Sequence, residues 1–147
     1  MKISKNAFTM IELVFVIVVL AILASVAIPK FSATRVDAQI TKGRADVASI
    51  RSAIVSERQS RLIKGDSNWI TALHGLNSGY YFDGVDANHT LLMYGIKAED
   101  KNGHWYGQSG NTYKFKLEDE NITFTYNPNN GTFDCEHNVT RCSDLTN

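Results

Sequence analysis

An apolar run from Leu13 to Ile28 without a charged side chain, close to the beginning of the chain, most constrains how this sequence can fold. Phe8 to Ile28 comprises 21 residues, and a helix of that length extends about 30 Å, the thickness of a bilayer's hydrocarbon core. We therefore expect a membrane-spanning helix. Its only ionisable side chain is Glu12, and an isolated carboxylate in lipid costs roughly 2.5–3.5 kcal/mol. A cationic group is expected to pair with it.

The residues around this run resemble the N-terminal motif of the type IV pilins and the type II secretion pseudopilins. In that motif a short leader ends in a small residue, and the mature chain begins with Phe, carries a Glu in its first turns and continues as a long apolar helix. The matching residues here are Ala7, Phe8, Thr9, Glu12 and Pro29, after a leader that contains Lys2 and Lys5. The resemblance covers roughly the first fifth of the chain.

The resemblance implies cleavage between Ala7 and Phe8 by a prepilin peptidase, followed by N-methylation of Phe8. It also implies assembly into a helical filament in which Glu12 of one subunit neutralises the Phe8 amine of another. Thr9 and Pro29 belong to the same assembly motif. The expected partners are sister pseudopilins, the peptidase, and an inner-membrane assembly platform with its ATPase.

The expected location is the inner membrane, crossed once, with the head in the periplasm and the filament in the periplasm or at the cell surface. We favour a pseudopilin for protein secretion because the head is small and its last loop short. A competence pseudopilin or a type IV pilin, serving DNA uptake, adhesion or motility, is the close alternative. Nucleic acid would be a partner only of the competence type, because no aromatic residues interleave with the basic ones.

Two further interpretations remain open from the residues themselves. Glu12 could mark the aqueous edge of a spanning helix, with its carboxylate reaching the interface. The basic start, the apolar run and Ser25-Val26-Ala27 also fit a secretory signal peptide cut after Ala27, which would release a soluble binding protein.

Beyond the apolar run, apolar residues spaced three and four apart predict one buried face of a second helical segment. These residues are Val36, Ile40, Gly43, Val47, Ile50 and Ile54. We divide the chain into a leader (1–7), a membrane and filament-core helix (8–29), an amphipathic stalk helix (30–64) and a globular head (65–147). Pro29 predicts a kink or local melting, and Lys64-Gly65 predicts the end of the helix.

In the head, Asp66-Ser67-Asn68 predicts a cap for a short helix from Trp69 to Leu73, ending near Gly75. Strands are expected at Leu91–Ile96, Thr112–Leu117, Ile122–Tyr126 and Thr132–Cys135, with turns at residues 118–121 and 127–131. The expected fold is therefore α+β and pilin-like, with a long N-terminal helix packed on a small antiparallel sheet of three or four strands.

Charge is unevenly distributed although the 15 basic and 15 acidic residues cancel. Residues 30–64 hold eight basic and three acidic residues, whereas residues 65–147 hold five basic and eleven acidic residues. Contact between the basic segment of one copy and the acidic head of another is one interpretation. Two ordinary solvated surfaces are the other.

Cys135 and Cys142 are the only cysteines, and in an oxidising compartment we expect them to form a disulfide. No metal site is expected, although Asp134, Glu136 and Asp144 are candidate oxygen ligands for calcium in the last loop.

Asn88, Asn121 and Asn138 are candidate N-glycosylation sites, because each begins an Asn-x-Ser/Thr sequon with an acidic residue two positions earlier. A fourth sequon at Asn130 lacks that residue.

No nucleophile, base or phosphate-loop pattern is present, so we expect no enzymatic activity. The four histidines lie far apart in the sequence, and each is expected at the surface or in a turn: His74, His89, His104 and His137.

Overall fold

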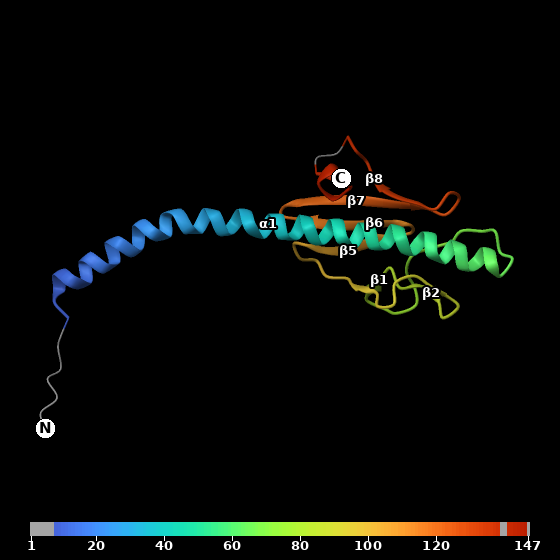
Figure 1. Ribbon diagram of the computed structural model, residues 1–147, viewed down its shortest axis with the longest axis horizontal. Coiled ribbons are helices and arrows are strands. Elements are labelled where there is room, and N and C mark those ends of the chain that lie inside the picture. Colours follow the sequence, from blue (N-terminus) through green and yellow to red (C-terminus); the bar gives the residue numbers. More distant parts are fainter. Residues whose placement is uncertain (1–7, 139–140, 147) are drawn as a thin grey trace, which may run out of the picture. The chain divides into compact units, whose positions relative to one another are not determined.

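The computed structural model describes residues 8–138 and 141–146. Its first element, α1 (Met10–Ile63), is helical throughout, including Pro29. The chain falls into two compact units, the first ending at Arg35 and the second beginning at Val36, and α1 contributes to both. A long N-terminal helix and small antiparallel sheets make the architecture α+β, as expected (Figure 1).

Both ends of α1 are closed by local hydrogen bonds. At its start, the Thr9 Oγ1 accepts a hydrogen bond from the Glu12 amide at 3.3 Å, which makes Thr9 the N-cap. At its end, the Gly65 amide donates to the Leu62 carbonyl and the Asp66 amide donates to the Arg61 carbonyl. This pair of bonds is a Schellman motif, with Gly65 at a φ of 85°. The helix end predicted at Lys64-Gly65 is therefore confirmed.

The rest of the second unit consists of short strands and one short helix. The four strands β5 (His104–Ser109), β6 (Thr112–Leu117), β7 (Glu120–Asn127) and β8 (Thr132–Cys135) form an antiparallel sheet in chain order. Two small antiparallel ladders precede it, one pairing β1 (Tyr80–Tyr81) with β4 (Ile96–Lys97) and the other pairing β2 (Gly84–Asp86) with β3 (His89–Thr90). Helix α2 (Cys142–Thr146) follows the sheet.

The core of the second unit lies between α1 and the β5–β8 sheet. Val47, Ile50 and Ile54 on the helix are buried in one cluster with the alternating inward residues of β6 and β7. The predicted helix face is thereby confirmed, and Figure 1 shows this part of α1 running alongside the sheet. Trp105 of β5 also donates from Nε1 to the Asp46 carboxylate of α1 at 3.1 Å. The helix is therefore attached to the sheet by both apolar and polar contacts.

The short helix predicted from Trp69 to Leu73 is wrong, because this segment is irregular. Its backbone groups find tertiary partners instead of helical ones. The Ile70 carbonyl accepts from the Tyr126 hydroxyl at 2.8 Å, and the Leu73 amide donates to the Tyr113 hydroxyl at 3.2 Å. The Asp66 carboxylate, predicted as a cap, accepts from the Asn68 amide in a local turn.

The strand predicted at Leu91–Ile96 is also wrong. Only Ile96 belongs to a strand, β4, while the Leu91 and Leu92 amides donate to the backbone carbonyls of Asp83 and Phe82 in an irregular loop. The strands at 112–117, 122–126 and 132–135 are confirmed, with β7 longer than predicted. The first turn is correspondingly shorter, comprising Glu118 and Asp119, and Glu118 adopts a φ of 55°.

Candidate functional site

The first unit exposes nearly all of its apolar side chains. Every large apolar residue of α1 from Met10 to Phe31 is exposed, with values between 38% for Val19 and 81% for Met10. The helix is long and apolar enough to cross a membrane by length and composition, and none of its most apolar window is buried. A signal sequence near an N-terminus passes the same test. Lipid or other apolar helices could cover an exposed apolar surface of this kind.

Glu12 lies in the first turn of this exposed helix, three residues after the Thr9 cap. The spacing Thr-x-x-Glu is that of a capping box, in which the cap oxygen accepts from the amide of the third helical residue. The structure contains this half of the box, since the Glu12 amide donates to Thr9 Oγ1. Among the residues that the structure describes, no hydrogen bond or ion pair involves the Glu12 carboxylate. Thr9 therefore has a local role in starting α1.

The remaining residues of the predicted N-terminal motif are Ala7, Phe8 and Pro29. Phe8 directly precedes the cap and is 75% exposed. Ala7, on the other side of the predicted cleavage point, lies outside the described residues. Pro29 lies inside α1, which remains helical on both sides of it, so local melting is absent from this structure.

The predicted disulfide between Cys135 and Cys142 is present and joins the end of β8 to the start of α2. Leu145 of α2 is buried against α1 at Gly43, where an added Cβ would lie 2.7 Å from Leu145 Cδ2. Arg44 of α1 donates from Nε to the Asp144 carbonyl. The disulfide and α2 therefore hold the C-terminal segment on the stalk part of α1.

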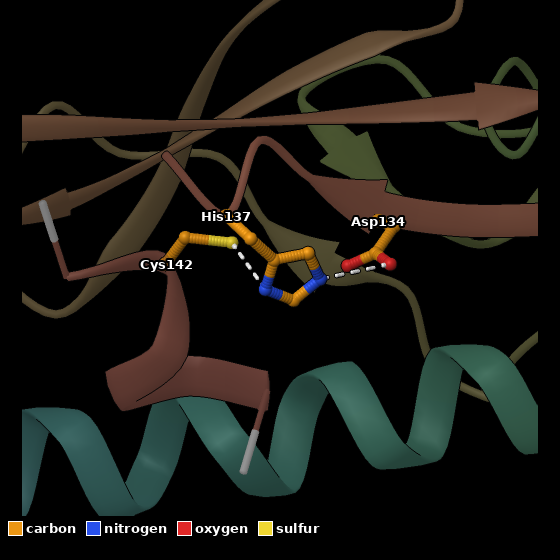
Figure 2. Close-up of side chains that lie close together, drawn as sticks. All are labelled: Asp134, His137 and Cys142. Carbon is orange, nitrogen blue, oxygen red and sulfur yellow. Dashed lines mark hydrogen bonds and ion pairs between the residues drawn. The ribbon is translucent and has the colours of Figure 1, made fainter. Parts of the chain in front are cut away.

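Asp134, His137 and Cys142 lie together beside this disulfide (Figure 2). His137 Nε2 is 3.4 Å from Asp134 Oδ2, and its Nδ1 is 3.8 Å from Cys142 Sγ. Cys142 is oxidised, so its sulfur cannot act as a thiolate ligand. Asp134 is also engaged by Arg51 of α1, at 2.9 Å between Oδ1 and Nη2. The group fits a structural hydrogen-bond network better than a metal centre.

The residues considered for calcium are not gathered into one set of ligands. Glu136 and Asp144 do not belong to the group formed by Asp134, His137 and Cys142. Asp144 instead pairs with Arg141 at 3.2 Å. Calcium prefers six to eight oxygen ligands, and Asp134 alone of the three candidates lies in the group.

Asn88, Asn121 and Asn138 all have exposed side chains. Asn88 lies in the turn between β2 and β3, where its amide donates to Asp86. Hydrogen bonds from the His89 imidazole and the Asn88 amide hold the pKa of Asp86 below its ordinary value. Asn121, predicted in a turn, is instead a residue of β7 opposite Lys116, because the turn before it is short. The last two residues of the Asn138 sequon lie outside the described residues.

The histidines are less peripheral than expected. His74 is partly buried and its Nδ1 lies 2.6 Å from the Tyr113 hydroxyl, while His104 and His89 belong to strands. Burial lowers the pKa of His74, an effect that Asp83 partly opposes. His137 is exposed and lies in a turn, which agrees with the expectation of a surface or turn position.

Sequence reasoning missed two residues of the head that carry unusual features. Phe82 is fully buried with a φ of 62°, and Asp83 is 2% exposed. Asp83 Oδ1 has no hydrogen-bond partner among the described residues. No sequence signal marks a left-handed Phe, whereas the Thr-x-x-Glu capping pattern at Thr9 could have been recognised.

Comparisons with protein-family models, curated proteins and solved structures found no significant match to this chain.

Proposed function

We propose that this chain is a structural subunit of a membrane-assembled filament of the pseudopilin type, built through its N-terminal helix and serving protein secretion. The observation that carries the proposal is the lone carboxylate of Glu12 in the first turn of α1, whose large apolar side chains from Met10 to Phe31 are all exposed. A soluble subunit could not keep that surface in water, and a lone lipid anchor has no need of the carboxylate.

The assembly step follows from charge pairing in an apolar environment. Cleavage after Ala7 would create a cationic amine on Phe8, one residue before the Thr9 cap. Two unpaired charges are costly in lipid, and each becomes less costly when paired with the other. When the Glu12 carboxylate of one copy meets the Phe8 amine of another, the two helices bundle and their axial register is fixed. The prepilin peptidase, the assembly platform and its ATPase would be the partners.

Substitutions of Glu12 test this pairing. Glu12→Ala and Glu12→Gln are expected to insert in the membrane at least as well as the wild type, because a lone carboxylate opposes insertion. Both are expected to lose filaments, as seen by electron microscopy of cells that carry the assembly machinery. Glu136→Gln, which removes an exposed acid of the head, is the matched control and should assemble normally. Normal filaments from Glu12→Ala would contradict the proposal.

The position of the filaments separates the secretion role from its close alternative. A secretion pseudopilus is expected to stay within the cell envelope, whereas a pilus for adhesion, motility or DNA uptake reaches the cell surface. Electron microscopy of intact cells with and without this chain distinguishes the two.

A further inference from the structure

A pocket on the head, remote in sequence from the N-terminal motif, combines three features that the filament helix does not explain. It is formed by the loop segments on both sides of β2 and β3. Its lining residues are Leu76, Asn77, Tyr80, Asp83 and the segment 90–95. The three features are a buried carboxylate with one free oxygen, a strained backbone beside it and an exposed apolar rim.

The buried carboxylate belongs to Asp83, which is 2% exposed. Its Oδ2 accepts hydrogen bonds from the backbone amide of Asn77 at 2.6 Å and from the Asn77 side chain at 3.2 Å. Its Oδ1 accepts none from the described residues. Buried polar atoms are almost always hydrogen-bonded, so a carboxylate oxygen without a donor among the described residues, in a side chain beside a pocket, is an unusual feature that calls for an explanation.

The backbone beside this carboxylate is held in a strained conformation. Phe82 has a φ of 62°, which is rare for an aromatic residue. Its ring is fixed in the aromatic core, with centroids 5.0 Å from Trp105 and 4.8 Å from Tyr113. The chain therefore turns sharply at Phe82 and brings Asp83 to the pocket. Strain of this kind persists where the surrounding structure enforces it, and it is concentrated at functional sites.

The loop that closes the pocket is tightly positioned. The Leu92 amide donates to the Phe82 carbonyl and the Leu91 amide donates to the Asp83 carbonyl. A Cβ on Gly95 would lie 2.9 Å from the Cβ of Asp83, so only Gly fits there. These contacts display Met93 and Tyr94, which are 88% and 83% exposed, at the rim. Adjacent large apolar side chains this exposed are typical of an interaction site.

The chemistry of the pocket favours an organic cation over a metal ion. Asp83 is its one carboxylate among the lining residues, and hard cations such as calcium prefer six to eight oxygen ligands. The negative charge of Asp83 would attract an alkylammonium or guanidinium group in the pocket, and the stem of that group can pack on Met93. Tyr80 and Tyr94 belong to the same lining, and aromatic rings attract cations.

We propose that this pocket binds a Lys or Arg side chain from the basic segment, residues 30–64, of a second copy of the chain. Charge complementarity supports this occupant, because residues 30–64 carry an excess of five positive charges and residues 65–147 an excess of six negative charges. No ion pair of Lys30, Arg35 or Lys64 occurs within the described part of the chain. The identity of the occupant rests on the proposed self-assembly, whereas the cation preference of the pocket does not.

The cation preference can be measured on the full chain dispersed in detergent micelles. Met93 is one of three methionines, with Met1 and Met10 in the N-terminal part of the chain, so its labelled methyl group reports on the pocket by NMR. Titration with N-acetyl-arginine amide is expected to shift the Met93 signal. N-acetyl-citrulline amide, a neutral molecule of similar shape, should bind at least tenfold more weakly. Equal shifts with both probes, or no shift with either, would overturn the proposal.

Two variants locate the contact. Asp83→Asn keeps the size of the side chain but removes its charge, and it should lose the preference for the arginine probe. Because Asp83 is buried, Tyr94→Ala provides a second test at an exposed position, where folding should be unaffected. It is expected to weaken binding of the arginine probe at least threefold. Unchanged binding in both variants would also overturn the proposal.

Photocrosslinking identifies the occupant. With the photoreactive residue p-benzoylphenylalanine in place of Tyr94, the assembled chain should crosslink to a second copy within residues 30–64, as mapped by mass spectrometry. Asp83→Asn should reduce this crosslink. Crosslinks to lipid alone, to another protein alone or to other parts of the chain would exclude the second copy as occupant. Filament formation by Glu12 variants is scored separately, so failure of the pocket and failure of the proposed function are distinguishable.

Discussion

Gly43 lies where α1 contacts both the sheet and α2. A Cβ at this position would be 2.7 Å from Leu145 Cδ2 and 3.0 Å from Phe115 Cζ. Gly43→Val should therefore destabilise the head by about 1–3 kcal/mol through overpacking. Val has a higher helix propensity than Gly, but this difference offsets only about half a kcal/mol of the loss. Denaturant unfolding of the full chain in micelles, followed by near-UV circular dichroism, measures the difference.

Ala48→Val is the matched control for this substitution, because Ala48 lies on the exposed face of the same helix. It should cost about half a kcal/mol, from propensity alone. Adding Leu145→Ala to Gly43→Val should give a loss smaller than the sum of the two single losses, since the overlapping side chain is removed. Strict additivity would show that the two residues do not compete for space.

His74 should make the stability of the head depend on pH. Burial lowers its pKa below the ordinary value of 6.5. As pH falls below about 6.5, the unfolded chain takes up the proton first. The stability that the neutral imidazole contributes is therefore complete above that pH and is lost as pH falls through the lower pKa of the folded state. Melting temperatures of the full chain in micelles between about pH 7.5 and about pH 5 measure this loss.

The hydrogen bond between His74 and the Tyr113 hydroxyl gives this loss of stability at low pH a structural basis. This hydroxyl oxygen accepts a hydrogen bond from the Leu73 amide, which leaves the O–H group to donate a hydrogen bond to Nδ1 of a neutral His74. Protonation of the imidazole would turn Nδ1 into a donor and end that bond. His74→Gln should therefore flatten the pH dependence, while His104→Gln, at a partly buried position outside this network, should leave it unchanged. Equal slopes in wild type and His74→Gln would contradict this role.

The disulfide is one of the contacts that attach α2 to the rest of the head. Cys135→Ser combined with Cys142→Ser should lower the free energy of unfolding by roughly 2–3 kcal/mol, the chain-entropy value for so short a loop. Denaturant midpoints measured with and without a reducing agent provide an internal control. The reductant should lower the wild-type midpoint to that of the double variant and leave the double variant unaffected. Equal stability of the double variant and the oxidised wild type would contradict this role of the bridge.

The elements predicted correctly from the sequence are those with a regular spacing of apolar side chains. This spacing is every second residue on a strand and every three to four residues on one face of a helix. Tyr113, Phe115 and Leu117 on β6 all point into the core, as their spacing requires. The face of α1 from Val47 to Ile54 is buried for the same reason. In both segments, local propensity and the tertiary core favour the same conformation.

Residues 66–97 could not be predicted in the same way, because their conformation depends on distant partners. The hydroxyls of Tyr113 and Tyr126, on β6 and β7, hold the backbone of Leu73 and Ile70. A local capping signal at Asp66 cannot compete with those bonds. The pocket around Asp83 depends on the left-handed backbone of Phe82, which only the packed aromatic core enforces. In the N-terminal motif, by contrast, Thr9 and Glu12 are close in sequence and their relation is local.

At the scale of the whole molecule, the two units place opposite demands on their surroundings. The unit from Val36 onwards buries its own aromatic core, whereas the unit ending at Arg35 leaves its apolar side chains exposed. The surface of the unit from Val36 onwards is compatible with water, whereas the apolar surface of the unit ending at Arg35 could be covered by lipid or by other apolar helices. A cut after Ala27 would remove most of the apolar surface, and a cut after Ala7 would keep all of it. Under the proposed function the chain would be cut after Ala7 and kept in the membrane, whereas a cut after Ala27 would release a soluble protein.

Substitutions of Ala7 and Ala27, the residues before the two candidate cleavage points, test which cut occurs. Intact-mass measurement and N-terminal sequencing of the mature protein should give Phe8 as the first residue, with a methyl group on its amine, in the membrane fraction. A signal peptidase needs a small residue before the cut, so Ala27→Leu would block release if Ser25-Val26-Ala27 were its site. We expect Ala27→Leu to change nothing and Ala7→Leu to prevent processing. A soluble protein that begins at Ile28, and that Ala27→Leu keeps in the membrane, would instead show that the apolar helix is a removable signal and that Glu12 has no part in assembly.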